Sequence, residues 1–277
     1  MDEPTIIGQE EAKRLMYLTS PCHLLLTGPP GIGKTTLACW HAINISEALI
    51  DPINGTQADR YMPLIDRAKG PIIIDECHAV KQAEMLYPML DQKIEQGIDG
   101  DGKKYVKIFI LATTDEGELL PALRSRLTTV SLRPYTMGEL AQICQLHNPS
   151  LRGDTAAKLS EYSKGSPRRA KRLGGIIANF QDKYGVQLKP HHVSPALKDI
   201  GQPNGLTSNE VRFMRLLEAG PLSKSSIMGM MGMGPDTVRM LETDLMGIGL
   251  VKIGYRGRSL TPKGQVALYE VKRVLEG

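Results

Sequence analysis

The sequence has 277 residues, of which 41% are hydrophobic and 23% are charged, with a formal net charge of +4. These values are ordinary for a folded globular protein and exclude a largely disordered or fibrous chain. No apolar run approaches the ~18 residues that a membrane helix needs. The charge leaves two interpretations open, an acidic partner such as nucleic acid or simply a slightly basic protein. The four cysteines form no C-x-x-C pair, so we expect no zinc site, no disulfide and a cytoplasmic location.

Three short apolar runs lie in the first part of the chain, at residues 23–27, 71–75 and 106–113, with helix-like segments between them. Continuous apolar runs of this length are typical of strands that are buried on both faces of a parallel sheet. We therefore predict that residues 1–133 form an α/β domain built on a parallel sheet.

The pattern changes to helices over residues 134–200. Thr136 and Glu139 have the spacing of a capping box, and further helices are expected at 155–162 and 167–183. We predict a small helical domain here. The turn-rich segment 201–205 then marks the start of a third domain, residues 201–277.

This third domain has the expected order helix, helix, helix, hairpin, helix, which is the order of a winged helix. Thr207 and Glu210 repeat the capping-box pattern at its first helix, and the hairpin surrounds residues 254–257. We expect Lys252, Arg256 and Arg258 to contact DNA phosphates. The alternative is that the domain binds another protein.

The segment 28–35 fits the pattern G-x-x-x-x-G-K-S/T and lies between an apolar run and a helix-like segment. Glycines allow backbone N–H groups to surround phosphates, and the N-terminus of the following helix adds positive potential. We expect Lys34 to contact the β- and γ-phosphates and Thr35 to ligate Mg²⁺. The alternative is a chance glycine-rich loop. The residues expected to bind the nucleotide here are Gly28, Pro29, Pro30, Gly31, Ile32, Gly33, Lys34, Thr35 and Thr36.

Polar residues end the second and third apolar runs, where ligands of α/β proteins bind. We expect Asp75 to be a second Mg²⁺ ligand and Glu76 to be the general base that activates the attacking water. Thr114 is expected to hold that water or the γ-phosphate. The alternative for Thr114 is an ordinary threonine at the end of a strand.

Two groups of basic residues follow. Arg124 and Arg126 need no partner inside their own subunit, and we predict that Arg126 reaches the γ-phosphate of a neighbouring subunit. Residues 164–172 hold five basic residues. Pro167 at the start of a helix fixes the orientation of Arg168, which we expect to reach the nucleotide. The alternatives are a solvated arginine pair and a solvated basic helix face.

These motifs in this order, followed by a winged helix, resemble the AAA+ ATPases and, among them, the RuvB family of branch-migration motors. The resemblance implies ATP and Mg²⁺ as cofactors and a homo-oligomeric ring, expected to be a hexamer. It further implies ATP-driven branch migration of junction DNA, with no membrane partner. It also implies a role for each matching residue: Ile7 beside the adenine, residues 28–35 as Walker A, Asp75 and Glu76 as Walker B, Thr114 as sensor 1, Arg126 as arginine finger and Arg168 as sensor 2.

The stretch between Pro88 and Thr113 looks shorter than its RuvB counterpart, in which a protruding hairpin docks the junction-binding partner RuvA. Residues 97–104 predict only a small hairpin, as in a compact variant from a phage or mobile element. Two other functions stay open. One is a clamp-loader-like or helicase-loader-like assembly ATPase, and the other is a nucleotide-switched winged-helix regulator that reads DNA sequence.

Overall fold

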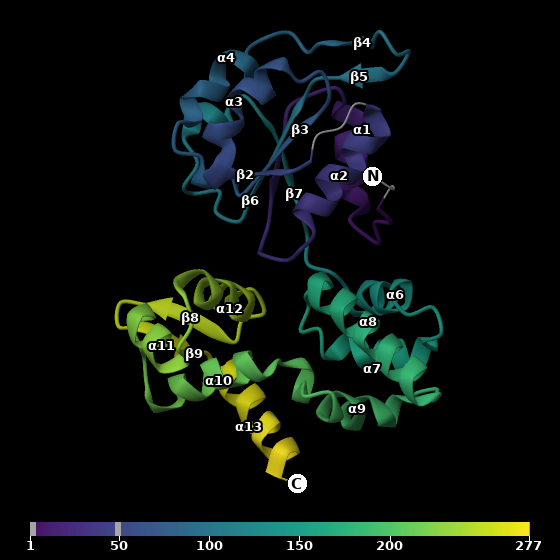
Figure 1. Ribbon diagram of the computed structural model, residues 1–277, viewed down its shortest axis with the longest axis vertical. Helices are drawn as coiled ribbons and strands as arrows, with labels where there is room; N and C mark the ends of the chain where they lie inside the picture. The colour runs from purple at the N-terminus through teal and green to yellow at the C-terminus, as the bar shows by residue number, and fades with distance from the viewer. Residues whose placement is uncertain (1–3, 48–50, 277) are drawn as a thin grey trace. The chain divides into compact units, whose positions relative to one another are not determined.

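A computed structural model describes residues 4–47 and 51–276. The chain divides into two compact units, Met1–Pro134 and Tyr135–Gly277, and Figure 1 traces each of them. The first boundary lies beside the predicted end of the α/β domain. The predicted division of the second unit near residue 200 stays a prediction.

The first unit is built on a parallel five-stranded sheet with the order β2-β3-β6-β1-β7. β1, β3 and β6 are the three central strands, and their apolar side chains are buried because helices cover both faces of the sheet. Thr27 at the end of β1 pairs with Thr113 at the end of β6, and β3 pairs with β6 in the same direction. The carboxyl ends of these strands therefore meet at one edge. The strands are β1 (Leu24–Thr27), β2 (Ile53–Asn54), β3 (Ile72–Asp75), β6 (Phe109–Thr113) and β7 (Thr128–Ser131).

Helices lie on both sides of this sheet. Figure 1 shows α1 and α2 on one side and α3 and α4 on the other. Leu25, Phe109 and Leu111 belong to the buried apolar cluster that faces α3 and α4. The α-helices are α1 (Glu10–Thr19), α2 (Lys34–Ile45), α3 (Ala58–Arg67), α4 (Tyr87–Leu90) and α5 (Pro121–Arg124), and the 3-10 helices are η1 (Gly55–Gln57), η2 (Cys77–Ala79) and η3 (Ala83–Leu86).

The apolar run 106–113 is not one strand, as the sequence predicts, but parts of two. β5 (Lys104–Val106) pairs with β4 (Gln96–Ile98) in an antiparallel hairpin outside the main sheet, and β6 begins only at Phe109. The backbone N–H of Lys107 donates to Glu95, extending the hairpin, whereas the carbonyl of Ile108 accepts from Ile72 of β3. The chain thus leaves the hairpin and enters the sheet between two adjacent residues. The small hairpin itself is confirmed.

The second unit begins with a group of helices. Thr136 caps the first of them, and its capping box with Glu139 is confirmed. α6 and α8 approach closely at Gly174, where a Cβ atom would lie 2.6 Å from the carbonyl oxygen of Cys144, so only glycine fits there. The elements are α6 (Met137–Leu146), α7 (Gly153–Glu161), α8 (Pro167–Tyr184), η4 (Pro190–His192), α9 (Val193–Asp199) and η5 (Pro203–Gly205).

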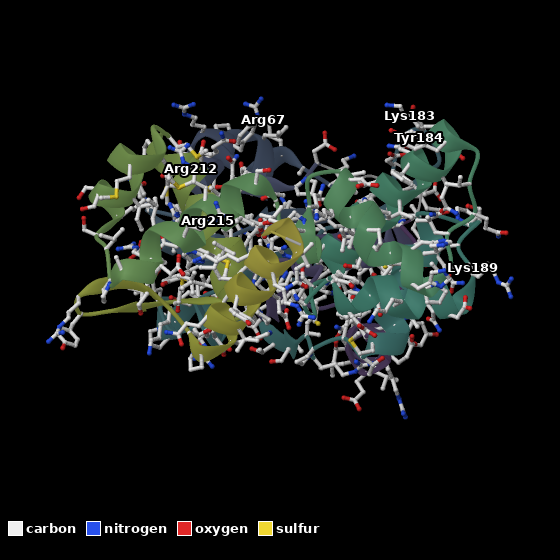
Figure 2. All side chains as sticks on the ribbon, turned by 90° about the horizontal axis from the view of Figure 1, so that it is seen from below. Arg67, Lys183, Tyr184, Lys189, Arg212 and Arg215 are labelled. Atoms are coloured by element: carbon white, nitrogen blue, oxygen red, sulfur yellow. The ribbon has the colours of Figure 1, made fainter. Side chains whose placement is uncertain are left out.

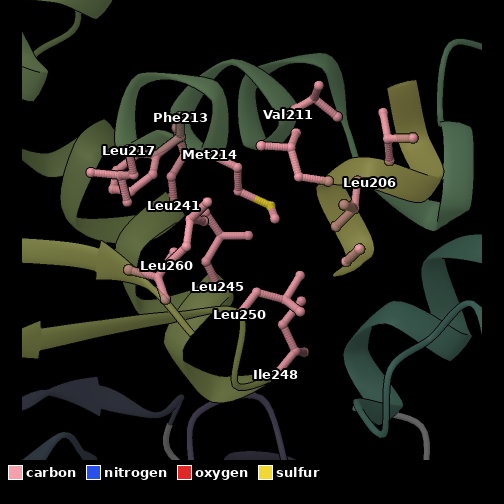
Figure 3. Close-up of a cluster of buried hydrophobic side chains, with 14 of the residues drawn as sticks. Leu206, Val211, Phe213, Met214, Leu217, Leu241, Leu245, Ile248, Leu250 and Leu260 are labelled. Atoms are coloured by element: carbon pink, nitrogen blue, oxygen red, sulfur yellow. The ribbon is translucent and has the colours of Figure 1, made fainter. Parts of the chain in front are cut away.

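The rest of the second unit has the element order expected of a winged helix. A capping box of Thr207 and Glu210 opens its first helix, as predicted. A single antiparallel bridge joins Leu222 to Arg258 of the hairpin. Leucines and other apolar residues from all these elements fill one core (Figure 3). The elements are α10 (Ser208–Leu216), η6 (Leu217–Ala219), α11 (Lys224–Met231), α12 (Pro235–Gly247), β8 (Val251–Gly254), β9 (Gly257–Leu260) and α13 (Pro262–Glu276).

Across the described parts of both units, none of the helices combines the length and the apolar character needed to cross a bilayer.

Candidate nucleotide site

The loop between β1 and α2 has the geometry of a phosphate cradle. Gly28, Gly31 and Gly33 have φ values of 149°, 74° and 98°, a region that favours glycine. Gly33 is the N-cap of α2 and has no side chain to cap it, and the N-terminus of a helix favours an anion. Lys34 is 5% exposed, and its Nζ donates to the carbonyl oxygens of Gly28 at 2.9 Å and Pro29 at 3.1 Å. The ammonium group therefore lies inside the loop.

Thr35 and Asp75 meet although they are forty residues apart in the sequence. The hydroxyl of Thr35 donates to Oδ2 of Asp75 at 2.6 Å, because α2 begins beside the carboxyl end of β3. A hydroxyl and a carboxylate are the oxygen ligands that Mg²⁺ accepts together with phosphate oxygens. The donor set therefore fits the predicted metal.

Glu76 follows Asp75 and lies at the same edge of the sheet. Its backbone is left-handed, with φ 51°, and a Cβ atom on Gly55 would lie 2.3 Å from its carbonyl oxygen. Gly55 is a residue that the sequence interpretation missed. Oε2 of Glu76 accepts hydrogen bonds from the hydroxyl of Thr114 at 2.8 Å and from its backbone N–H at 3.3 Å. The predicted general base and the predicted sensor thus contact each other.

Two further residues extend this contact: His78, to which the sequence interpretation gave no role, and Thr113, which it placed with Thr114 at the sensor-1 position. Nδ1 of His78 lies 2.9 Å from the hydroxyl of Thr113 and 3.4 Å from Oε2 of Glu76. Thr113 is fully buried. The signal for His78 in the sequence is its position two residues after Glu76.

Ile7 is half-buried in the segment that precedes α1. The segment is fastened at Gln9, whose amide donates to the carbonyl oxygen of Arg133 at 2.7 Å and accepts from its N–H at 3.2 Å. The residue before Arg133 is Leu132, which lies against Gly28 of the phosphate loop. The segment is thus held close to the loop, and the contact of Ile7 with adenine stays a prediction.

Both arginines near α5 have partners in their own chain, so the prediction that they need none is wrong. Arg126 makes a two-pronged ion pair with Asp91, with N···O distances of 2.8 and 3.0 Å, and lies over the ring of Tyr87. Arg124 pairs with Glu116 at 2.5 Å. A planar guanidinium matches a carboxylate in this way when the two are brought together by the fold. The role of Arg126 toward a neighbouring subunit stays a prediction.

The basic residues of α8 are not one solvated face. Arg169 forms a buried ion pair with Glu210, and Arg172 donates to the side chain of Gln202 at 2.8 Å. Arg168 is mostly exposed, with its Nη1 3.3 Å from a carboxylate oxygen of Asp244 in α12. The role of Arg168 as a nucleotide sensor stays a prediction.

The hairpin of the second unit presents Lys252 and Arg256 to solvent. Arg256 lies over the ring of Tyr255, which is 93% exposed and was missed by the sequence interpretation. Arg258 differs, because its Nε donates at 2.6 Å to the buried Glu242.

α10 adds two exposed arginines, Arg212 and Arg215, which the sequence interpretation also missed. They lie close together along this helix (Figure 2). The described surface of this part of the second unit therefore carries more positive charge than the hairpin alone.

Comparisons with known proteins agree with this geometry. Residues 24–135 match the ATPase family associated with various cellular activities (AAA). The chain is 30% identical over 269 residues to the Holliday junction branch migration complex subunit RuvB of Phytoplasma mali (strain AT), covering 87% of this chain and 80% of that protein. It is also 30% identical over 292 residues to RuvB 1 of Synechococcus sp. (strain JA-3-3Ab), covering 92% and 77%. The solved structure of the Thermotoga maritima RuvB Holliday junction branch migration motor superposes with a TM-score of 0.74 at 26% identity, covering 95% of each chain.

The parallel sheet, the phosphate loop and the acidic pair at the end of β3 define an AAA+ ATPase, an ATP-hydrolysing enzyme. Within that class, the chain belongs to the RuvB family.

Proposed function

We propose that this chain is an ATP-driven translocase that moves the branch point of four-way DNA junctions as a homo-oligomeric ring. One observation carries the proposal. Thr35 contacts Asp75 and Glu76 contacts Thr114 at one edge of one sheet, which supports a metal-binding pair beside a hydrolytic pair. The names of the relatives above supply the junction as the substrate class.

Different groups in and beside the phosphate loop contact different parts of the bound ATP. Lys34 supplies a positive charge beside the β- and γ-phosphates, and the N–H groups at the start of α2 donate to the phosphate oxygens. Thr35 and Asp75 hold Mg²⁺, which neutralises phosphate charge when bound. Glu76 accepts the proton of the attacking water.

Two arginines are proposed to complete the site from outside the sheet. Arg126 of one protomer stabilises the developing charge on the γ-phosphate bound to the next, and Arg168 senses the nucleotide. The Asp91 carboxylate holds the Arg126 guanidinium in a fixed orientation until that contact forms. A neighbouring protomer is required because the arginine acts between subunits.

The second unit is proposed to contact DNA through its hairpin. Lys252 and Arg256 are the exposed phosphate contacts. Arg258 contributes less to DNA binding because Glu242 already pairs with it. α12 carries three acidic residues and only one basic residue, Arg239, which disfavours insertion into a major groove for base reading. This charge pattern favours a motor that follows the DNA backbone over a regulator that reads sequence.

The test is dissociation of a labelled mobile four-way junction by the purified chain alone. We expect ATP-dependent conversion into two duplexes by the unaltered protein and none by Glu76→Gln, which should bind ATP but not turn it over. Hydrolysis without any junction movement would instead favour an assembly ATPase. It would also be the expected result if a RuvA-like partner were required, and adding such a partner separates the two.

A second measurement tests the hairpin. Because phosphate contacts release counterions, Lys252→Ala with Arg256→Ala should weaken binding about equally for unrelated DNA sequences and make the salt dependence less steep. Lys189→Ala, an exposed lysine elsewhere in the second unit, is the matched control. A site preference that survives the double substitution would contradict the assignment.

A further inference from the structure

The carboxylate of Glu76 is held through one of its two oxygens. Oε2 accepts from Thr114 twice, and Nδ1 of His78 lies 3.4 Å from the same atom. His78 lies in η2, which starts immediately after Glu76. Its side chain is 13% exposed, whereas that of Glu76 is 35% exposed. The histidine is therefore the more buried of the two partners.

The hydroxyl of Thr113 lies between Asp115 and the ring of His78. It donates to the carbonyl oxygen of Asp115 at 3.0 Å, and its oxygen accepts the N–H of Asp115 at 3.0 Å. With the hydroxyl proton on that carbonyl, the 2.9 Å contact with Nδ1 of His78 uses a proton on Nδ1. The hydrogen bond to Thr113 sets the position of Nδ1, which lies at the longer distance of 3.4 Å from Oε2 of Glu76.

We propose that His78 is a positioning residue for the general base, an inference that rests on the proposed role of Glu76. Thr113 orients the imidazole, and Nδ1 of His78 then lies beside Oε2 of Glu76, the oxygen that accepts from Thr114. The other oxygen, Oε1, is then the atom that takes the proton from the attacking water. A glutamate side chain has three rotatable bonds, so fixing one oxygen reduces the number of orientations in which the other meets the water.

The proposal predicts a specific pattern among substitutions of His78. Asparagine places its amide nitrogen near the position of Nδ1, whereas glutamine places its amide nitrogen near that of Nε2. We expect His78→Ala and His78→Gln to lower kcat about tenfold, less than the ~10²–10⁴-fold contribution of a general base itself. His78→Asn should recover most of the rate. ATP affinity should not change, because the contacts of His78 are with Thr113 and Glu76 and not with the phosphate loop.

The experiment measures kcat, ATP affinity and Tm for these variants, with His191→Ala, an exposed histidine of the second unit, as the matched control. Thr113→Val should slow turnover in the same way, with Thr113→Ser close to the unaltered rate. The double variant Thr113→Val with His78→Ala should have a kcat close to that of either single variant, because both substitutions break the same chain of contacts. Thr113→Val and His78→Asn keep the test decisive even if His78→Ala does not fold.

Two results separate the inference from the function on which it rests. If the unaltered protein does not hydrolyse ATP, or if Glu76→Gln hydrolyses it normally, the proposed function is wrong. If Glu76→Gln stalls while His78→Ala retains the full rate, only the positioning role is overturned. An additive loss in the double variant, or no recovery with asparagine, also overturns it.

Discussion

Lys34 is a charged side chain buried in its own loop, an arrangement that costs free energy unless the charge is well partnered. The carbonyl oxygens of Gly28 and Pro29 are among its acceptors. Carbonyl oxygens carry only partial charge, whereas phosphate oxygens carry full negative charge. The ammonium group is therefore better partnered when a triphosphate enters the loop.

Lys34→Ala should weaken ATP binding by about ten- to a hundredfold, since hydrogen bonds to charged groups contribute ~1.5–3 kcal/mol. Calorimetry or a fluorescent ATP analogue measures this directly. Lys81→Ala, an exposed lysine of the same unit, should bind ATP normally. Equal affinity in the two variants would refute the assignment of the loop.

Acid should destabilise the first unit through His41, which is buried in α2. Burial lowers the pKa of His41 to about 4, and its Nε2 has no hydrogen-bond partner among the described residues. Since the unfolded chain binds a proton near pH 6.5 and the folded chain does not, the free energy of unfolding falls as pH drops from about 6.5 toward 4. The loss reaches roughly 3 kcal/mol, because one pKa unit corresponds to about 1.4 kcal/mol.

Urea unfolding at a series of pH values measures this loss, and His41→Leu should make the decline shallower. Burial also lowers the pKa of His23, so part of the decline should remain in that variant. A pH dependence identical in both proteins would contradict the role of His41.

The sequence predicts the contacts that the parallel sheet brings together and misses those that depend on turns. Thr35, Asp75 and Glu76 were expected together because parallel strands deliver their ends to one edge. The pair of Arg126 with Asp91 was not, because it joins residues 35 positions apart through a turn with no periodic pattern. The same holds for His78 and Thr113, whose contact depends on the path of a 3-10 helix.

At the scale of elements, one buried ion pair joins two helices of the second unit. Arg169 of α8 pairs with Glu210 of α10, and the side chains are 6% and 5% exposed. Glu210 also accepts from the N–H of Thr207 at 2.7 Å and so completes the cap of α10. The residue next to the predicted nucleotide sensor Arg168 is thus tied to the first helix of the winged-helix segment.

Arg169→Ala should lower the free energy of unfolding by about 3–5 kcal/mol, because it leaves Glu210 charged and buried without its partner. Denaturant unfolding gives the value. Replacing both residues with methionine should recover a large part of the loss, and Arg168→Ala, which removes an exposed pair, should cost less than about 1 kcal/mol. If Arg168→Ala and Arg169→Ala lowered the free energy of unfolding equally, burial of the ion pair would not explain the cost of Arg169→Ala.

Most helices of the second unit were predicted because caps and prolines mark their starts, whereas α9 was not. Ser166 caps α8 through the N–H of Arg169 with Pro167 following, and Gly185 ends the helix with φ 62°. β2 and β7 were missed because one has two residues and the other is half threonine. The break between β5 and β6 could not be read from the sequence, because Val106 at the end of β5 and the apolar residues of β6 form one run that only Lys107 interrupts.

At the scale of the whole molecule, the proposed mechanism requires that residues of two protomers hydrolyse one ATP. Lys34, Asp75 and Glu76 belong to the loop and strand ends of one sheet, whereas Arg126 is turned toward Asp91 and Tyr87. A protomer that lacks Lys34 still offers Arg126, and one that lacks Arg126 still offers its phosphate loop. Each single variant should be nearly inactive alone.

The most direct measurement is the rate of ATP hydrolysis in mixtures of Lys34→Ala and Arg126→Ala proteins at constant total concentration and varied ratio. If Arg126 acts on the nucleotide of a neighbour, activity should reappear in the mixtures and be greatest at intermediate ratios. Some neighbouring protomers then combine an intact phosphate loop with an intact arginine. A rate that stays at the level of the separate variants at every ratio would contradict this role of Arg126.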